Sequence, residues 1–286
     1  MQLKPAIPVM TRRMSRIRPS DILKNAYMVV VVALMLFPLY LMLIGSVKNL
    51  DQILDNFFVP TFPLNFGNYA KAFRFVSPYY LNTAWYAVLS TVSTVFVAAI
   101  AGYSFAVLRF PGRRILFMVL FAKMFLPGIM SLVPSFLLAT KLGILNTSLV
   151  IVLFCVGTSQ PFWVFVMKTF VGQQPKELFE AMRIDGASEM QIFLRLAFPL
   201  LRPMVSLMSL NVILFVWNDF IWPLVTLTDP AKRTITVGIF KLAAAAGIDY
   251  GMLIAGYALA ALPLLIAFFF SMKQFMAGLT AGAIKF

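Results

Sequence analysis

The strongest constraint on this chain is a set of six apolar runs, each long enough to cross a bilayer as a helix. A bilayer core needs about 20 apolar residues per helix. Hydrophobic residues make up 61% of the 286 positions and charged residues only 12%, about half the charged share of a soluble domain. We therefore predict an all-α membrane protein with six transmembrane helices. The runs are 26–47, 81–108, 115–138, 149–170, 204–227 and 252–275.

The basic residues divide unevenly between the two sides that six such helices would create. Sixteen lie before the first run, within 109–114, within 168–202 or near the C-terminus, and seven lie in the other connections. The positive-inside rule places the richer side in the cytoplasm. We therefore expect a cytoplasmic tail of residues 1–25, a transmembrane domain of 26–275 with a cytoplasmic loop at 172–202, and a cytoplasmic tail of 276–286. The net charge of +14 then indicates anionic lipid headgroups as partners, and not nucleic acid.

Several kinds of chemistry are absent from the residues themselves. The chain has no histidine and a single cysteine, Cys155, which lies in an apolar run. No phosphate-binding G-x-x-x-x-G-K-[S/T] motif is present. We therefore predict no catalytic, metal or cofactor-binding residues, and no ATP hydrolysis by this chain. Of the expected outer connections (49–80, 139–148 and 228–251), the first holds three prolines between Phe-rich segments, and we expect it to form a small ordered cap.

The loop at 172–202 concentrates acidic charge, since it holds four of the ten acidic residues of the chain. Pro175 suits the start of a helix, and Glu177 would lie near the helix N-terminus, where the macrodipole favours an acid. Gly186 would end this short helix, because glycine adopts the left-handed conformation without a Cβ clash.

A second short helix is expected directly after that glycine. Ser188 with Gln191 three residues later predicts a capping box, and Pro199 and Pro203 predict a break before the fifth run. A helix, a glycine corner and a second helix would form a knob that fits a groove on a partner protein. An amphipathic connector lying on the membrane surface fits the same residues, and the residues alone leave both interpretations open.

The fifth run contains Trp217, Asn218 and Asp219. A carboxylate inside a membrane is costly and is expected to face the bundle interior or a wet pathway. One interpretation is a lining of a translocation path, where tryptophan stacks on sugar faces and the polar groups bind hydroxyls. The other, which we favour slightly, is that Asp219 and Asn218 form an interhelical hydrogen bond or an outer gate without substrate contact. Lys123 in the third run either pairs with an acid or extends to the interface.

Short motifs along nearly the whole chain are typical of one transport family. Each motif is weak alone, but their order and spacing together are specific. The chain resembles the carbohydrate-type permeases of ATP-binding-cassette (ABC) importers, and within them the smaller membrane subunit of maltose-type systems. The motifs are Phe37-Pro38-Leu39-Tyr40, Arg109-Phe110-Pro111-Gly112, Leu126-Pro127-Gly128, Glu180-Ala181 with Asp185-Gly186-Ala187, Trp217-Asn218-Asp219-Phe220 and Gly278-Leu279-Thr280-Ala281-Gly282.

The resemblance implies a type I permease fold whose cytoplasmic coupling helix docks in a cleft of an ATPase subunit. Carried over residue by residue, the docking residues are Glu180, Ala181, Asp185, Gly186 and Ala187. Met182, which replaces the usual second alanine of the motif, is counted among these coupling residues. The resemblance also implies that the C-terminal tail reaches the ATPases through Gly278, Leu279, Thr280 and Gly282.

The resemblance further implies a set of partners in a bacterial plasma (inner) membrane. These are a second permease, two ATP-binding subunits that hold ATP and Mg²⁺, and an extracytoplasmic solute-binding protein. The expected cargo is a sugar or oligosaccharide, and a polyol or a glycerol phosphodiester is the alternative. A stand-alone secondary transporter and an intramembrane enzyme are the rivals from other classes. The first lacks coupling acids apart from Asp219, and the second lacks histidine and paired acids within the spans.

Overall fold

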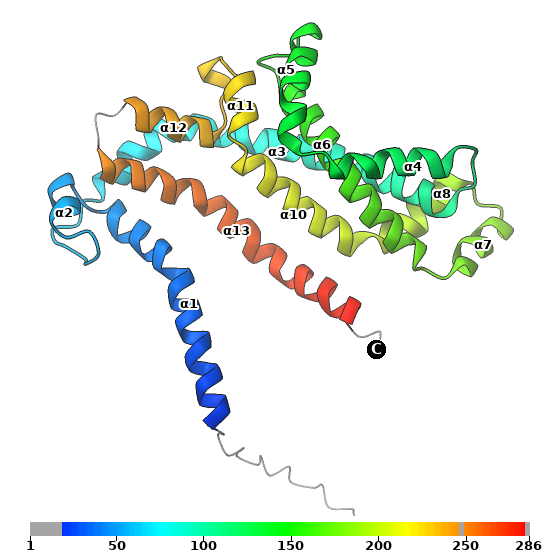
Figure 1. The fold of residues 1–286 in the computed structure, drawn as a ribbon, viewed down its shortest axis with the longest axis horizontal. Coiled ribbons are helices and arrows are strands. Elements are labelled where there is room, and N and C mark those ends of the chain that lie inside the picture. The colour runs from blue at the N-terminus through cyan, green and yellow to red at the C-terminus, as the bar shows by residue number, and fades with distance from the viewer. Residues whose placement is uncertain (1–18, 246–248, 284–286) are drawn as a thin grey trace, which may run out of the picture.

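The computed structural model describes residues 19–245 and 249–283, and these form a helical membrane domain (Figure 1). Short 3-10 turns at Lys123–Phe125, Gly128–Ser131 and Pro230–Lys232, and a π-helical turn at Phe193–Ala197, join some of the helices. The α-helices are α1 (Pro19–Ser46), α2 (Leu50–Asp55), α3 (Gly67–Val107), α4 (Arg113–Ala122), α5 (Leu132–Lys141), α6 (Ser148–Gly172), α7 (Lys176–Ile184), α8 (Glu189–Ile192), α9 (Phe198–Leu200), α10 (Arg202–Asn218), α11 (Ile221–Thr226), α12 (Ile235–Ala245) and α13 (Tyr250–Ala283).

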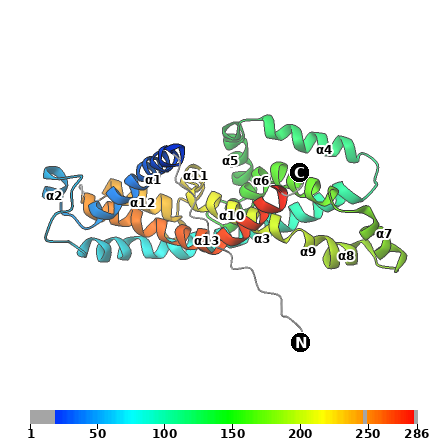
Figure 2. The same ribbon diagram turned by 90° about the horizontal axis from the view of Figure 1, so that it is seen from below.

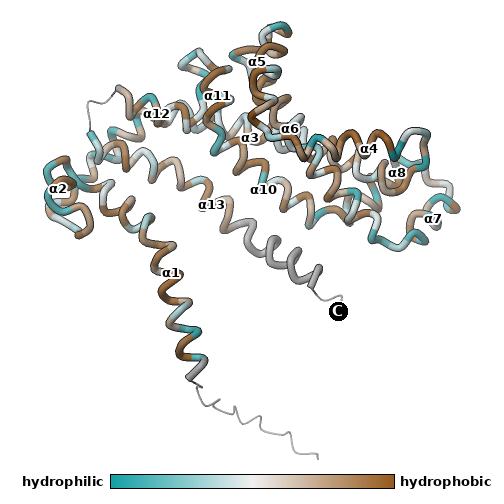
Figure 3. Tube along the Cα trace, viewed as in Figure 1, coloured by the Kyte–Doolittle hydropathy of each residue, from teal (hydrophilic) through white to brown (hydrophobic). Residues whose placement is uncertain are grey.

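The domain is elongated, with α2 and α7 at opposite ends in both views (Figures 1 and 2). Hydrophilic residues gather at these two ends, whereas the helices between them are largely apolar (Figure 3). We call them the α2 end and the α7 end. Helix α3 has 41 residues, so it is about 60 Å long at 1.5 Å per residue and connects the two ends.

Helices α3, α6 and α10 form the core of the domain. Their buried side chains make one continuous apolar cluster that includes Tyr103, Met167 and Val212. At Gly102 the helices α3 and α6 come so close that an added Cβ would lie 2.4 Å from the Cβ of Met167. Glycine at this position therefore permits close packing of α3 on α6.

Four of the expected spans are single long apolar helices, α1, α3, α6 and α13. Helices α1 and α6 match the predicted runs closely, whereas α3 begins earlier than predicted, at Gly67, and α13 continues without a break past the predicted end of its span to Ala283. Helix α1 diverges from the other helices and packs against α13 near its own C-terminal end (Figure 1). Its apolar side chains are mostly exposed, which in a bilayer leaves them available to lipid or to another chain.

The third predicted run is not one straight helix, so the prediction of a single continuous helix there was wrong. Residues Arg113–Phe125 and Gly128–Lys141 meet at an angle of 106°. Leu126 is extended and Pro127 follows it, which is the backbone that proline imposes on its neighbour. Lys123 lies at this break and donates to the carbonyl of Gly157 on α6. The Lys123 side chain therefore connects this break to α6. It pairs with no acid among the described residues.

The fifth predicted run, 204–227, also differs from the structure. The preceding segment Glu189–Leu200 meets α10 at 74°, so the break expected from Pro199 and Pro203 is confirmed at Leu201. Helix α10 then ends at Asn218 and α11 is a separate short helix. Asp219 therefore lies at a helix break and not deep inside a span.

Two predicted connections contain more helix than expected. Residues 67–80, assigned to the first outer connection, are the first turns of α3, where Pro78 is accommodated inside the helix. Only 49–66 remains as a connection, and α2 orders its first part. The connection 228–251 contains α12, whose apolar side chains Ile235, Val237, Ile239 and Leu242 are buried. Burial against neighbouring helices stabilises α12 in a way that the local sequence does not reveal.

Candidate functional site

The loop 172–202 folds locally much as its residues predict. Pro175 is the residue before α7, and Glu177 lies in the first turn of that helix. At the other end, Gly186 has a φ of 81°. The amide of Gly186 donates to the Arg183 carbonyl at 3.0 Å and that of Ala187 to the Met182 carbonyl at 2.9 Å. This pair of bonds is a Schellman motif, which ends a helix on a left-handed residue.

The second short helix begins at the predicted capping box. The Ser188 hydroxyl accepts from the amide of Gln191, and the Gln191 side chain accepts from the amide of Ser188 at 2.8 Å. The helix continues through the π-helical turn Phe193–Ala197 to Leu200. The predicted helix, glycine corner and second helix are therefore confirmed as local structure.

Three apolar residues in and beside α7 attach that helix to the transmembrane core. Phe179 is 4% exposed and is the only fully buried residue described on α7. Met182 and Ala187 are half-buried and pack on the same apolar cluster. The motif positions Met182 and Ala187 thus face the bundle, whereas the predicted docking face placed Met182 toward a partner.

The opposite side of the loop is open to solvent. Glu180, Ala181, Asp185 and Gly186 are exposed, and the apolar side chain of Ile184 is 87% exposed. An exposed isoleucine beside acidic residues marks this side of the loop as a contact surface. The exposed part of the motif is therefore Glu180, Ala181, Asp185 and Gly186.

A polar network connects this loop to the end of α3. The buried Tyr103 hydroxyl donates to Glu189 Oε2 at 2.6 Å, and Arg183 Nε donates to Glu189 Oε1 at 2.8 Å. Hydrogen bonds from Arg183 hold the pKa of the Glu189 carboxyl below its usual range. The same bonds raise the pKa of Arg183. The Tyr103 ring lies 5.5 Å from the ring of Phe193 and 6.3 Å from that of Phe179, so α7, the second helix and α3 meet at one point.

Sequence reasoning missed Phe179, Tyr103, Arg183 and Glu189 as members of this site. Tyr103 is 86 residues from Glu189 in the chain, so no spacing rule could connect them. The Arg183–Glu189 pair did have a local signal, because the two residues flank the glycine corner with opposite charges.

A cleft of about 840 Å³ opens beside α7. Its walls come from the end of α3, the turn before α4 and the loop itself. Glu180, Arg183 and Glu189 line one side of the cleft and Arg109 and Arg113 the other. Charges of both signs at an open cleft favour a protein contact over a binding site for a small apolar ligand.

The residues Trp217, Asn218 and Asp219 divide between packing and exposure. The indole of Trp217 is buried and donates to the carbonyl of Ala260 on α13 at 3.1 Å. The Asp219 carboxylate accepts from the amide of Trp222 at 3.4 Å, within its own turn. Asn218 bonds within its own helix, to Leu214 at 2.8 Å, and is exposed.

The same region borders a second cleft of about 520 Å³ between α10, α12 and α13. Trp217 and Asn218 are among its lining residues, with aromatic side chains from Phe220, Phe240 and Tyr257. The interhelical bond is made by Trp217, whereas we had expected it from Asn218 and Asp219, whose side chains bond within their own helix and turn. Asn218 is among the residues that line the cleft.

The comparisons with known proteins identify the group to which the chain belongs. Residues 95–281 match the family model described as binding-protein-dependent transport system inner membrane component. This chain belongs to that family. The matched range includes the exposed loop, the clefts and the core helices α6 and α10.

Relatives of this permease extend over nearly its whole length. It is 34% identical over 263 residues to a permease protein of the arabinooligosaccharide transport system of Bacillus subtilis, covering 88% of this chain and 91% of the relative. It is 30% identical over 272 residues to a lactose transport system permease of Rhizobium radiobacter, covering 94% and 98%. The resemblance to carbohydrate-type ABC importer permeases is confirmed by these matches.

Solved structures share the fold. A chain of a bacterial ABC transporter that imports the acidic polysaccharide alginate superimposes with a TM-score of 0.81, covering 94% of this chain and 100% of that one, at 20% identity. The alginate transporter in complex with its periplasmic protein superimposes with a TM-score of 0.66 at 16% identity, covering 88% and 93%. The permease is thus a multi-pass, all-helical inner-membrane component.

The C-terminal tail residues of the permease lie on a helix. Gly278, Leu279, Thr280 and Gly282 belong to the last turns of α13, which continues directly from the span. Their side chains lie outside the described residues. Their contact with ATPase subunits stays a prediction.

Proposed function

We propose that this permease is one membrane subunit of an ABC importer that carries a sugar or oligosaccharide across a bacterial plasma membrane. Its partners would be a second permease, two ATP-binding subunits that hold ATP and Mg²⁺, and an extracytoplasmic binding protein. The names of its relatives, which transport arabinooligosaccharides and lactose, favour a sugar over a polyol or a phosphodiester. The solute that co-purifies with the cognate binding protein would test this choice.

The geometry of α7 carries the proposal. The helix is anchored on the bundle through Phe179 and Met182, and it presents Glu180, Ala181 and Asp185 on its free side. A short helix that is held on one side and exposed on the other is suited to insertion into a groove of a partner. We assign that groove to an ATPase subunit.

In this mechanism ATP-driven closure of the partner ATPases moves α7, and α7 moves the spans. Closure of the two ATPases on ATP would displace the exposed helix, and the Phe179 and Glu189 contacts would pass the displacement to α3. Rigid elements that move together change access between the two sides of a membrane. The preference of the ATPases for one state supplies the free energy of the shift.

We further propose that the cleft at Trp217 and Asn218 forms part of the sugar path. Aromatic rings and an exposed amide combine a surface for the apolar faces of a sugar ring with a partner for its hydroxyls. The second permease would complete the wall of the path.

The proposed orientation places the α7 end and both termini in the cytoplasm. To test it, Cys155 is replaced by Ser, and single cysteines are placed at Thr11, Lys232 or Ala283 in intact cells. An impermeant thiol reagent should label only the Lys232→Cys variant. Labelling of the Thr11→Cys variant from outside would reverse the orientation.

The function itself is tested by Gly186→Leu. The φ of 81° costs a side chain about 1 kcal/mol, and nothing in this chain lies within 4 Å of an added Cβ. The variant should therefore fold and insert, yet lose ATPase co-purification and nearly all uptake, because leucine would collide with the ATPase. Gly143→Leu is the matched control, since Gly143 also has a positive φ of 66° and open space around it.

Glu180→Lys tests the same surface by charge, with Asp55→Lys at the α2 end as its control. Reversal at a contact site places like charges together and should reduce ATPase binding at least tenfold. If Gly186→Leu and Glu180→Lys both bind the ATPase and import solute at wild-type rates, the loop is a plain connector and the proposal fails.

A further inference from the structure

A basic turn lies between α3 and α4, and Arg113 at its end has a structural role. Gly112 has a φ of 77° and directly precedes α4. Arg113 donates to the carbonyls of Leu108 at 2.8 Å and Ala106 at 3.3 Å, so its guanidinium caps the C-terminal end of α3. The tight turn places Arg114 at the start of α4 and directs this helix back along α6.

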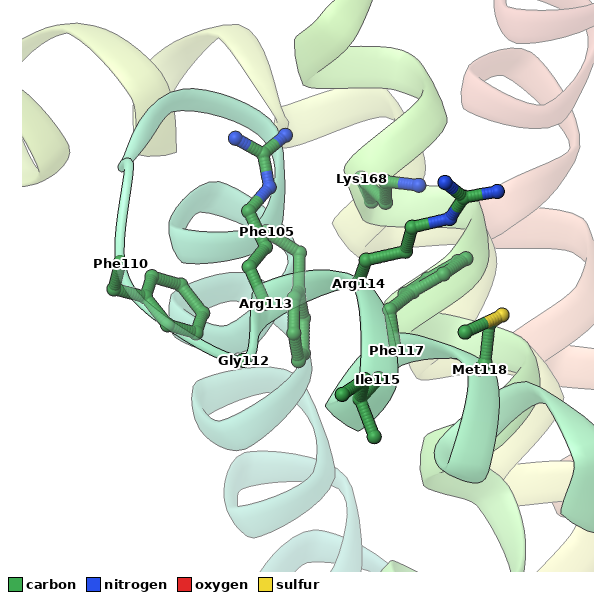
Figure 4. A pocket seen from close by; sticks show the side chains of 9 residues that line it. All are labelled: Phe105, Phe110, Gly112, Arg113, Arg114, Ile115, Phe117, Met118 and Lys168. Carbon is green, nitrogen blue, oxygen red and sulfur yellow. The ribbon is translucent and has the colours of Figure 1, made fainter.

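A cleft of about 910 Å³ opens where this turn, α4 and α6 meet (Figure 4). Phenylalanines and other apolar side chains form most of its wall, and three cations lie among them. Figure 4 shows Arg114 and Lys168 extending to the same side, beside Phe117. Lys168 Nζ lies 3.5 Å from the centre of the Phe117 ring, which is the geometry of a cation–π contact. The lining residues are Phe105, Phe110, Gly112, Arg113, Arg114, Ile115, Phe117, Met118 and Lys168.

The charge of this cleft is not balanced within the part of the chain that the structure describes. No lining residue is acidic, and Arg113, Arg114 and Lys168 form no ion pair with a described acid. Cations that converge without a counter-charge raise the local positive potential and favour a bound anion. This cleft differs from the neighbouring one beside α7, where Glu180 and Glu189 offset the arginines.

The surroundings of the cleft indicate what kind of anion fits. Along α4, Ile115, Leu116 and Val119 are more than half exposed, as expected of a helix that faces lipid. The apolar part of the cleft continues this surface, and the cations lie at the end of the helix, where a bilayer meets water. Such a combination matches a molecule with a phosphate at one end and a hydrocarbon chain at the other.

We propose that this cleft binds an anionic phospholipid, with its phosphate held by Arg114 and Lys168 and an acyl chain along Phe105 and Phe117. Arg113 contributes charge while it caps α3. The inference requires only that the chain spans a membrane, and it does not depend on an ATPase docking at α7. A free phosphate would satisfy the cations but leave the apolar wall uncovered.

The test uses the full chain in its assembled transporter, titrated with phosphatidylglycerol or phosphatidylcholine and followed by native mass spectrometry. The double variant Arg114→Gln with Lys168→Gln should lose affinity for phosphatidylglycerol by roughly fivefold per charge removed. The charge-conserving variant Arg114→Lys with Lys168→Arg should retain it. The matched control is Arg195→Gln with Arg202→Gln, which removes two exposed charges outside the cleft.

Three results would overturn the proposal. They are equal affinity in the double variant and its control, equal affinity for the two lipids in the unmodified chain, and displacement of the lipid by inorganic phosphate.

A second measurement leaves every basic residue unchanged. In a Cys155→Ser background, a cysteine at Met118 should react with a membrane-soluble maleimide more slowly when phosphatidylglycerol is present. Efficient cross-linking of that cysteine to a neighbouring subunit would show that protein covers the cleft, and would also overturn the proposal.

Discussion

The two ends of the domain are held in different ways. At the α2 end, buried polar side chains bond to backbone carbonyls of distant segments. Lys48 is 1% exposed, and its ammonium donates to the carbonyls of Asn56, Phe57 and Val59 at 2.5, 3.2 and 2.6 Å. Asn68 donates to the carbonyls of Ser46 and Lys48 at 3.0 and 2.8 Å. The connection 49–66 is thus attached to both α1 and α3.

The same pattern secures the other connection at this end. Asn82 donates to the carbonyl of Ala231 at 2.7 Å, and the Tyr86 hydroxyl to that of Lys232 at 2.9 Å. The buried Thr83 hydroxyl accepts from the amide of Ile235 at 2.9 Å. Hydrogen bonds between segments this far apart, some of them buried, favour a rigid surface at the α2 end.

In the loop at the α7 end, the short helices are capped mainly by residues of the loop itself. Its Schellman motif and capping box are local, and its polar link to the spans is the Tyr103–Glu189–Arg183 network. Arg183 and Glu189 keep 38% and 45% of their side chains exposed, so the ion pair between them contributes at most about 1 kcal/mol. Helix α7 is capped by its own residues and few of its side chains attach it to the bundle, so it can move as a unit. The α2 end is thus a rigid surface, whereas we propose that α7 is a transmitting element.

The largest effect is expected from Lys48→Met at the rigid end. This variant removes three hydrogen bonds from a charged donor, each worth about 1.5–3 kcal/mol. Limited proteolysis should cut within 49–66, while ATPase co-purification persists. Lys71→Met is the control, because Lys71 is exposed and pairs only with Asp249 at 3.3 Å. Unchanged protease resistance in Lys48→Met would mean that the α2 end is not organised by this lysine.

A smaller, functional effect is expected from Tyr103→Phe at the transmitting end. The variant keeps the ring packing on Phe179 and Phe193 but removes the bond to Glu189, worth about 1 kcal/mol. Stability should change little, and sugar imported per ATP hydrolysed should fall roughly threefold to fivefold in reconstituted vesicles. Tyr80→Phe, at a tyrosine whose ring lies 6.3 Å from that of Trp217, is the control. If Tyr103→Phe and Tyr80→Phe transport sugar equally well per ATP, the hydroxyl transmits nothing.

The smallest effect concerns pH and the Arg183–Glu189 pair. Arg183 lowers the pKa of Glu189 in the folded chain, so the pair stabilises the loop above the ordinary glutamate pKa of about 4.3. This stabilisation disappears as the pH falls through the lower pKa of the folded state. Glu189→Gln should remove that part of the acid sensitivity, by no more than about 1 kcal/mol, in unfolding curves compared with the wild type. If the double variant Arg183→Glu with Glu189→Arg regains the acid sensitivity, charge pairing is its cause. Identical acid unfolding curves for the wild type and Glu189→Gln would exclude charge pairing as the cause.

The local features of this protein could be predicted from its residues. Gly186 ends α7, and Ser188 with Gln191 begins the next helix, because caps and turns depend on groups within a few positions of each other. Long apolar runs likewise predicted the membrane helices α1, α6 and α13. The motif that contains Glu180 and Asp185 was identified by the family resemblance, and both residues are exposed.

Only the tertiary structure decided which breaks and contacts occur. Pro78 and Pro161 lie inside continuous helices, whereas the chain bends by 106° at Pro127. The neighbouring helices decide whether a proline is absorbed or breaks the span. Tyr103 meets Glu189, and Lys168 meets Phe117, because α3 and α6 pack closely at Gly102. Contacts between segments dozens of residues apart depend on packing of the whole bundle, and no periodicity or motif within the chain encodes them.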